Sequence, residues 1–336
     1  MIRIAVDGMG GDFAPREIVR GAQSISREGL ASIVLVGDEE KMRPFVTDHA
    51  NLDMVHTPVC VEMNEAPSNA LRKKRDSSMN KAFELHKSGE VQAVVTAGNS
   101  GAAMAFAIFT LGRIPGVDRP AIATLHPRMG EGVSILLDAG GTVDCKPTHL
   151  AQFALMGNAF AASVLGIASP RVGILSNGEE ETKGNELTRE AHALIREFGL
   201  NYLGYVEGTD MYNGRTDVVV SDGFVGNIAL KISEGVADLI FEFFREGIKK
   251  SRKAQMGYFL LKDLFKEFQK KADYSETGGA PLLGVDGVCI ICHGKSNEKA
   301  MRNAILLAKK FVEKGLKESV GEAMQDYQSF QKVKER

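Results

Sequence analysis

The chain has 336 residues, of which 44% are hydrophobic and 25% charged, an ordinary composition for a soluble globular protein. At roughly 100–200 residues per domain, this length allows one large domain or two medium ones, each able to bury a core. Lys and Arg total 41 against 43 Asp and Glu, which leaves a net charge of −2. Because so even a balance argues against a surface devoted to nucleic acid, we expect no nucleic-acid partner.

Four cysteines are too few for a disulfide scaffold. The first residues, Met1 to Asp7, lack a basic leader, a long apolar stretch and a cleavage site, so we expect no signal peptide and a cytoplasmic protein. The most apolar longer stretch, 150–168, contains Gln152 and Asn158. It predicts a buried helix rather than a membrane span, which needs about 20 apolar residues.

Short runs rich in Val and Ile alternate with glycine turns and amphipathic segments. The runs predict strands at 2–6, 33–36, 91–96, 133–137, 171–175, 202–206, 218–220 and 288–291. Helices are predicted at 15–26, 101–111, 148–165, 186–198, 225–250 and 297–320. This alternation predicts an α/β fold with a mostly parallel sheet and helices on both faces, whose ligands bind at the carboxyl ends of the strands.

One segment departs from the even charge. Residues 249–271 hold eight basic and two acidic side chains, a local charge of +6, around the apolar centre 256–261. We interpret it as two long helices that meet near Gly257 and project from the sheet. No linker or repeat divides the chain, so we expect a single domain, 1–336, with a helical excursion at about 225–272.

The first glycine turn contains Asp7, Gly8, Gly10, Gly11 and Asp12. Backbone N–H groups in such a turn can bind an anion at a helix N-terminus. The spacing G-x-G-G lacks the last glycine of the dinucleotide fingerprint G-x-G-x-x-G, and two carboxylates would repel a pyrophosphate. The turn is therefore a phosphate-binding candidate or a purely structural strand–helix turn, with NAD as the least favoured alternative.

Two further turns offer uncharged and charged polar groups. Gly98, Asn99 and Ser100 suit a phosphate or an acyl carbonyl oxygen, or they cap the helix that follows. The stretch 177–185 contains Lys183, which can bind phosphate or polarise a carbonyl, although a solvated lysine explains it too. Its other candidate binding residues are Asn177, Gly178 and Glu179.

The remaining turns follow the strands near 220 and 290. Asn227 falls in the first turn of a long helix that Asp222 would cap. The constrained run with Gly278 and Gly279 precedes a strand that ends at His293, a histidine that is either catalytic or structural.

The segment 289–293 matches the haem-attachment pattern C-x-x-C-H. In a strand, residues three apart point to opposite faces, so Cys289 and Cys292 could not share a metal. We interpret both as core residues. No other His, Cys or carboxylate cluster has metal-ligand spacing, and we expect neither metal nor cofactor.

Several motifs in collinear order resemble the bacterial phosphate acyltransferase family, the acyl carrier protein:phosphate acyltransferases of phospholipid synthesis. These motifs lie at 5–15, 75–79, 96–101, 177–184, 222–227 and 278–284. The resemblance extends from the first residues to about 318. The sequence departs from the pattern at Thr277, where an aromatic residue is expected, and at Lys295, where a serine is expected.

The resemblance implies a single Rossmann-type domain that forms homodimers. It also implies that inorganic phosphate attacks the thioester of a long-chain acyl group on acyl carrier protein, giving acyl phosphate for a downstream glycerol-3-phosphate acyltransferase. Lys183 and Asn227 match positions that the family uses in catalysis. We hypothesise that Lys183 binds phosphate or developing negative charge, that Asn227 donates to the thioester oxygen, and that His293 protonates the leaving thiolate.

The basic helical excursion is then a candidate for docking acidic carrier protein or for transient association with an anionic membrane, on the inner face of the cell membrane. Its docking residues would be Lys253, Met256, Tyr258, Phe259, Leu260 and Leu261. The alternative is a hairpin that packs a dimer. A second docking candidate comprises Arg72, Lys73, Lys74 and Arg75.

Two functions from other classes stay open at this point. One is a dinucleotide-dependent oxidoreductase, which would change nicotinamide fluorescence. The other is a non-catalytic module that binds acyl carrier protein or lipid, which would release no thiol in the presence of phosphate.

Overall fold

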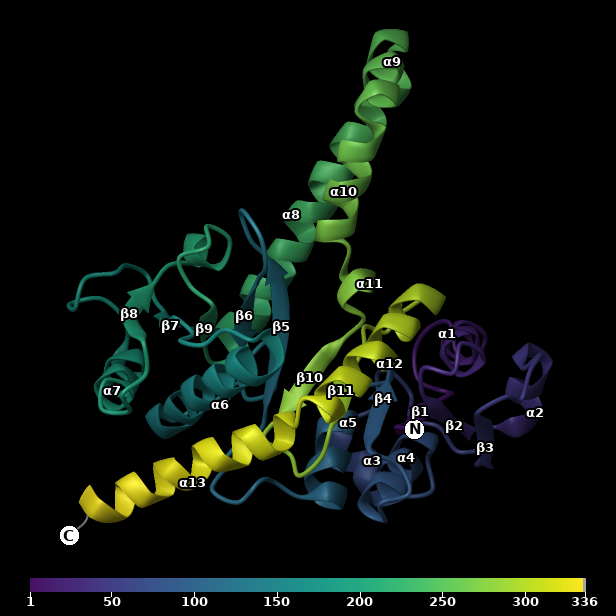
Figure 1. Ribbon diagram of the computed structural model, residues 1–336, viewed down its shortest axis with the longest axis horizontal. Helices are drawn as coiled ribbons and strands as arrows, with labels where there is room; N and C mark the ends of the chain where they lie inside the picture. Colours follow the sequence, from purple (N-terminus) through teal and green to yellow (C-terminus); the bar gives the residue numbers. More distant parts are fainter. Residues whose placement is uncertain (335–336) are drawn as a thin grey trace.

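The computed structural model describes residues 1–334, and one sheet runs through it (Figure 1). The strand order is β3-β2-β1-β4-β11-β10-β5-β6-β9-β7-β8. The strands are β1 Arg3–Asp7, β2 Ser32–Gly37, β3 Leu52–His56, β4 Ala93–Thr96, β5 Ala121–Pro127, β6 Val133–Leu137, β7 Val172–Leu175, β8 Tyr202–Val206, β9 Val218–Val220, β10 Ala280–Leu283 and β11 Cys289–Ile291.

Two parallel blocks of strands are joined by an antiparallel centre. The blocks are β3-β2-β1-β4-β11 and β6-β9-β7-β8, and β10 and β5 pair antiparallel with their neighbours between them. The predicted α/β class with a mostly parallel sheet is confirmed. The sequence patterns missed β3, β5 and β10.

Helices cover both faces of the sheet (Figure 1). The helices are α1 Arg16–Arg27, α2 Glu39–Met42, α3 Pro67–Lys73, α4 Ser78–Lys87, α5 Ser100–Phe106, α6 Pro147–Leu165, α7 Glu186–Ile195, α8 Gly223–Lys250, α9 Arg252–Leu260, α10 Lys262–Ala272, α11 Tyr274–Thr277, α12 Glu298–Glu313 and α13 Leu316–Lys334. Short helical turns lie at Arg43–Phe45, Ala107–Leu111 and Gly208–Met211.

The sheet separates the core into layers. In β4, Ala93 and Val95 pack with α1, α6 and α12, whereas Val94 packs with α4 and α5 on the other face. Cys289 and Cys292 also fall in opposite layers, as the alternation of a strand requires. The two sulfurs therefore belong to different core layers, as predicted.

The apolar stretch at 150–168 forms the buried helix α6, also as predicted. Across the described residues, every helix is too short or too polar to cross a lipid bilayer. The helix predicted over 297–320 is instead two helices, because Gly315 adopts a left-handed φ of +61° between α12 and α13.

The helical excursion is an arm built from the outer part of α8 with α9 and α10, and it projects away from the sheet (Figure 1). Gly257 lies inside α9 rather than at the junction of two helices, so that prediction is wrong. The helices break at Ser251 and Leu261. Aromatic pairs line the seam of the arm, with ring centroids of Phe241 and Phe268 5.4 Å apart.

Candidate functional site

A cavity of about 420 Å³ lies at the carboxyl ends of the central parallel strands. The segments that follow β1, β4, β6 and β11 line it, together with β5 and the first turns of α8. Its size falls in the range of ligand sites. The lining includes seven of the predicted site residues, namely Asp12, Gly98, Ser100, Asn227, Gly278, Gly279 and His293.

In the first glycine turn, Asp7 has a structural role. Asp7 is buried beneath the turn, where its carboxylate accepts hydrogen bonds from Ser78 Oγ (2.6 Å) and Thr96 Oγ1 (2.7 Å). Burial raises the pKa of Asp7. A Cβ on Gly10 would lie 2.7 Å from the backbone nitrogen of Gly98, so the next turn fills the space that a pyrophosphate would need. This packing favours the structural interpretation of the turn over NAD binding.

Gly8, Gly11 and Asp12 of the same turn contact different parts of the protein. A Cβ on Gly8 would meet the Met42 sulfur, so Gly8 packs against α2 and does not line the cavity. Gly11 has a φ of +102° and lies against Gly294. The Asp12 amide donates to the Gly294 carbonyl oxygen (2.7 Å), which joins the first turn to the segment after β11.

Asn99 does not line the cavity but binds the neighbouring loop, which contributes Met63 to the cavity wall. Its side-chain oxygen accepts from the Ala102 amide (3.0 Å) and caps α5. Its Nδ2 donates to the carbonyl oxygens of Met63 and Glu65, each at 2.9 Å. The capping alternative therefore holds for Asn99, while Ser100 faces the cavity.

Asn227 is positioned by the start of α8. Asp222 caps this helix by accepting from the Phe224 and Val225 amides, both at 2.9 Å. Gly226 packs directly on the main chain of Asp138, where any side chain would overlap the carbonyl oxygen. These contacts fix the first turn of α8 and direct the next residue, Asn227, into the cavity.

The sequence analysis missed Asp138. Its carboxylate accepts from the backbone amides of Ile122 (2.8 Å), Gly141 (2.8 Å) and Thr142 (2.6 Å), and it thereby folds the loop that supports α8. Burial raises the pKa of Asp138 to about 6, although these hydrogen bonds act to lower it. The signal was present, because Asp138 to Gly141 is another acid-and-glycine turn after a Val- and Leu-rich strand.

A second missed pair lies on α8 beyond Asn227. Lys231 and Glu234 both line the cavity and form an ion pair of 2.7 Å. Lys231 is four residues from Asn227 and so shares its helix face. The cation that lines this cavity with Asn227 is therefore Lys231, which no sequence motif singled out.

The two ends of the stretch 177–185 line a different cavity, of about 390 Å³, to which Asn177, Asp222 and Val225 contribute. Lys183 folds over Gly178 and lies 3.9 Å from a Glu180 carboxylate oxygen. Lys183 does not line the cavity that contains Asn227. The first turn of α8 stands between the two, with Val225 facing one cavity and Asn227 the other.

Glu179 also lies outside the main cavity, paired with Arg215. His293 does line that cavity, and its Nδ1 accepts from the Lys295 amide (3.1 Å). The neighbouring Cys292 thiol lines the cavity too, but burial raises its pKa, so it stays a protonated thiol. Among the described residues, no group of three His, Cys, Asp or Glu side chains could hold a metal ion.

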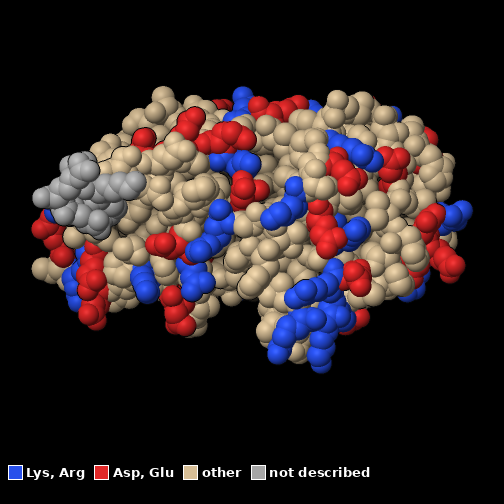
Figure 2. Space-filling view, turned by 90° about the horizontal axis from the view of Figure 1, so that it is seen from below, with Lys and Arg blue, Asp and Glu red and all other residues tan. Residues whose placement is uncertain are grey.

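The face seen from below carries interspersed acidic and basic side chains, with one gathering of Lys and Arg on a protrusion (Figure 2).

The second predicted docking candidate lies in and just after α3. Arg72 and Lys73 on α3 are exposed, as is Arg75 just beyond it. Lys74 is engaged within the molecule by Glu65 Oε2 and the Cys60 carbonyl oxygen, each at 2.8 Å. Three of the four predicted docking residues are thus available to a partner.

At the tip of the arm, Met256, Phe259 and Leu260 are at least 66% exposed, whereas Tyr258 packs on Phe265 with ring centroids 5.4 Å apart. Lys253 and Leu261 are exposed as well. The apolar tip is therefore as predicted except for Tyr258, which stabilises the arm.

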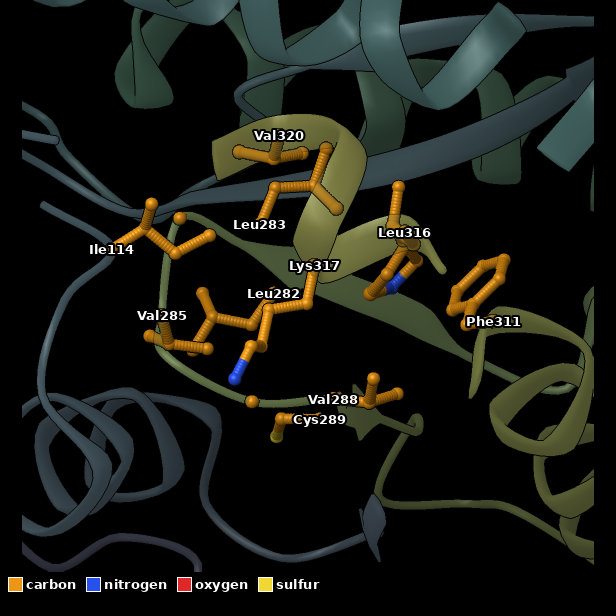
Figure 3. Close-up of a pocket in the computed structure, with 13 residues that line it drawn as sticks. Ile114, Leu282, Leu283, Val285, Val288, Cys289, Phe311, Leu316, Lys317 and Val320 are labelled. Carbon is orange, nitrogen blue, oxygen red and sulfur yellow. The ribbon is translucent and has the colours of Figure 1, made fainter. Parts of the chain in front are cut away.

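A small apolar cavity lies between β10 and the junction of α12 and α13 (Figure 3). Its walls are mostly aliphatic, and Lys317 at its rim pairs with Asp286 at 2.9 Å. Its volume of about 10 Å³ is at the limit for one water molecule. It is a packing gap between elements and not a ligand site.

Comparisons with known proteins place this geometry in a family. The model of the family described as "Fatty acid synthesis protein" matches residues 2–319. A phosphate acyltransferase of Geobacter sulfurreducens is 50% identical, with 99% of each chain covered, and one of Pelobacter propionicus is 51% identical over 97% of this chain and 95% of its own. The chain therefore belongs to the phosphate acyltransferases of the fatty acid synthesis protein family.

Solved structures with low sequence identity share the fold. A phosphotransacetylase of Streptococcus pyogenes superposes with a TM-score of 0.64 at 17% identity, covering 93% of this chain and 94% of its own. A branched-chain phosphotransacylase of Enterococcus faecalis gives 0.56 at 12% identity, covering 92% and 99%. At these identities the likeness concerns the fold alone.

Proposed function

We propose that the protein transfers a long-chain acyl group from acyl carrier protein to inorganic phosphate. The observation that carries this proposal is the cavity at the carboxyl ends of the strands, where Asn227, Ser100 and His293 face a space bordered by aliphatic side chains. Membership of the phosphate acyltransferases supports the choice of phosphate as acceptor. The thioester donor and the carrier are the parts that this proposal adds.

The reaction needs no covalent enzyme intermediate. A phosphate oxygen attacks the thioester carbonyl carbon, a C–O bond forms, and the C–S bond breaks with the electron pair leaving on sulfur. Thiolate is a good leaving group, so the protein has to align two anions and stabilise the oxyanion. The products are acyl phosphate and the free carrier thiol.

Each polar group has a role that its position supports. The Asn227 amide donates to the thioester oxygen, and His293, whose Nδ1 is an acceptor, donates a hydrogen bond from Nε2 to the leaving sulfur. The proton that the thiol gains is the one that hydrogen phosphate loses. Lys231 supplies positive charge on the wall that Asn227 occupies. Lys183, next to Gly184 on the other side of the first turn of α8, would attract phosphate to the protein by its charge before phosphate reaches the thioester.

Three surfaces suit the partners of this reaction. Exposed Arg72, Lys73 and Arg75 would attract an acidic carrier protein. The apolar tip of the arm, flanked by lysines, would enter an anionic membrane surface where acyl phosphate is used. An apolar stripe on α8, with Leu239 68% and Phe243 74% exposed, would be covered in a homodimer.

The test is release of carrier thiol from an acyl carrier protein thioester. We expect wild-type protein to release thiol in proportion to added phosphate, and Asn227→Ala to release it at least a hundredfold more slowly, the usual cost of one oxyanion donor. Asn201→Ala is the matched control, because Asn201 lies outside the cavity and donates to the Ser169 carbonyl oxygen. Binding of the thioester with no phosphate-dependent thiol release would reject the enzyme in favour of a binding module.

A further inference from the structure

A second apolar cavity, of about 450 Å³, adjoins the candidate active site. The two cavities share Leu125, Leu230, Glu234 and Thr277 as a common border. The second cavity lies where the base of the arm meets the sheet, between α8, α10 and the end of β5. Figure 1 shows α8 and α10 side by side at this base.

The walls of the second cavity are suited to hydrocarbon. Ile232, Val236, Ala237 and Ile240 contribute one face of α8, and Phe268 of α10 stands opposite. Phe268 is held there by its contact with Phe241. Apolar side chains on two facing helices would remove an alkyl chain from water, which favours its binding in proportion to the apolar area buried.

The charged groups at this cavity are each engaged elsewhere. Lys271 pairs with Glu267 at 3.0 Å, and Asp273 pairs with Lys299 at 3.2 Å. Glu234, at the shared border, pairs with Lys231 at 2.7 Å. Each of these carboxylates and ammonium groups already has a partner of opposite charge, so none of them requires a polar ligand in the space between the walls.

The polar groups of the wall are also satisfied. His126 Nε2 lies 2.9 Å from Thr124 Oγ1, and the Tyr212 hydroxyl donates to Ser233 Oγ. Burial lowers the pKa of His126 to about 4, so the imidazole is neutral at pH 7. Because the polar groups of the wall are already hydrogen-bonded and its charges already paired, the wall favours an apolar occupant.

We propose that this second cavity, the chain cavity, holds the alkyl chain of the acyl substrate while its thioester lies beside Asn227. The assignment rests on the proposed function, and it specifies which residues hold the acyl chain and limit its length. The chain would pass the border formed by Leu125 and Leu230 and run along α8 toward Phe268. Substrate length would then be set at the base of the arm, away from the reacting atoms.

The test fills the chain cavity and measures dependence on chain length. Ala237→Trp places an indole in the cavity, and Asp238→Trp, at an exposed position of the same helix outside both cavities, is the matched control. Turnover is followed with octanoyl and hexadecanoyl carrier protein thioesters. We expect Ala237→Trp to lower kcat/KM at least tenfold more for hexadecanoyl than for octanoyl, since tenfold is about 1.4 kcal/mol, or roughly two methylene groups.

A second variant, on the opposite wall, tests the assignment independently in case Ala237→Trp does not fold. Phe268→Ala enlarges the cavity, and we expect it to shift the preferred chain length upward. Equal effects of Ala237→Trp on both thioesters, with no shift in Phe268→Ala, would overturn the chain-cavity assignment while leaving the reaction intact. Absence of thiol release by wild-type protein from either thioester would instead reject the proposed function itself.

Discussion

Gly226 packs on the main chain of Asp138 so closely that a side chain at position 226 would overlap the Asp138 carbonyl oxygen. The contact joins the loop after β6 to the first turn of α8. Asn227 comes next in the chain and faces the candidate active site. The position of the Asn227 amide therefore depends on the absence of a side chain at Gly226.

This contact predicts that Gly226→Ala shifts the first turn of α8 and lowers turnover by at least tenfold, because misplacing a catalytic group by about 1 Å can cost about a hundredfold. Gly235→Ala is the matched control on the same helix, with no atom within 4 Å of the added Cβ. We expect that substitution to stabilise α8 by about 0.5–1 kcal/mol and to leave turnover unchanged. Steady-state kinetics and thermal unfolding of the two variants test the pair, and equal turnover in both would contradict it.

Asn227 lines the main cavity, whereas Lys183 lies outside it and precedes Gly184, which lines the cavity on the other side of the start of α8. We therefore expect different kinetic signatures from their alanine variants. Lys183→Ala should raise the KM for phosphate, whereas Asn227→Ala should lower kcat at saturating phosphate. Initial rates over a range of phosphate concentrations distinguish the two, and identical changes in both parameters would contradict separate roles.

His126 predicts a pH-dependent stability. Its folded pKa of about 4 lies below the ordinary 6.5 because of burial, so the unfolded chain binds the extra proton first as pH falls. The stability due to neutral His126 is present above pH 6.5 and is lost between pH 6.5 and 4, by about 3 kcal/mol in total. Urea unfolding across this range should show a steeper loss in wild-type protein than in His126→Gln, and parallel curves would be the contrary result.

The arm predicts membrane association through its tip. Leu260 is 78% exposed there, and inserting a carboxylate in its place should abolish binding to anionic vesicles. Phe109→Glu is the control, because Phe109 is 75% exposed but lies outside the arm. Sedimentation with phosphatidylglycerol vesicles should pellet wild-type and Phe109→Glu protein and leave Leu260→Glu in solution; equal pelleting of all three would assign the arm to another role.

Much of the fold could be predicted, because buried parallel strands leave continuous Val and Ile runs and each ends in a glycine turn. The missed strands lack that signature. β3, Leu52–His56, lies at the edge of the sheet and is partly exposed, and β10, Ala280–Leu283, contains a proline and pairs antiparallel. Gly315 ended α12 through a left-handed φ that the amphipathic pattern over 297–320 did not reveal.

Many individual residues of the candidate site could be predicted from the sequence, but not which of them line the same cavity. Each glycine turn that was a site candidate falls near a strand end, so the sequence could not distinguish residues that line the cavity from those that support it. Asp7 has the same local pattern as Asp12, yet Asp7 is buried beneath the turn and Asp12 faces the cavity. Lys231 gave no signal, because a lysine on an exposed helix face is ordinary until the opposite wall is known.

The measurement that tests the central claim most directly is the ratio of acyl phosphate formed to carrier thiol released. Hexadecanoyl carrier protein, inorganic phosphate and the protein are mixed, and both products are quantified over the same interval. The proposed reaction predicts one acyl phosphate for each thiol and no thiol without phosphate. Thiol release without acyl phosphate would identify a hydrolase and contradict the account.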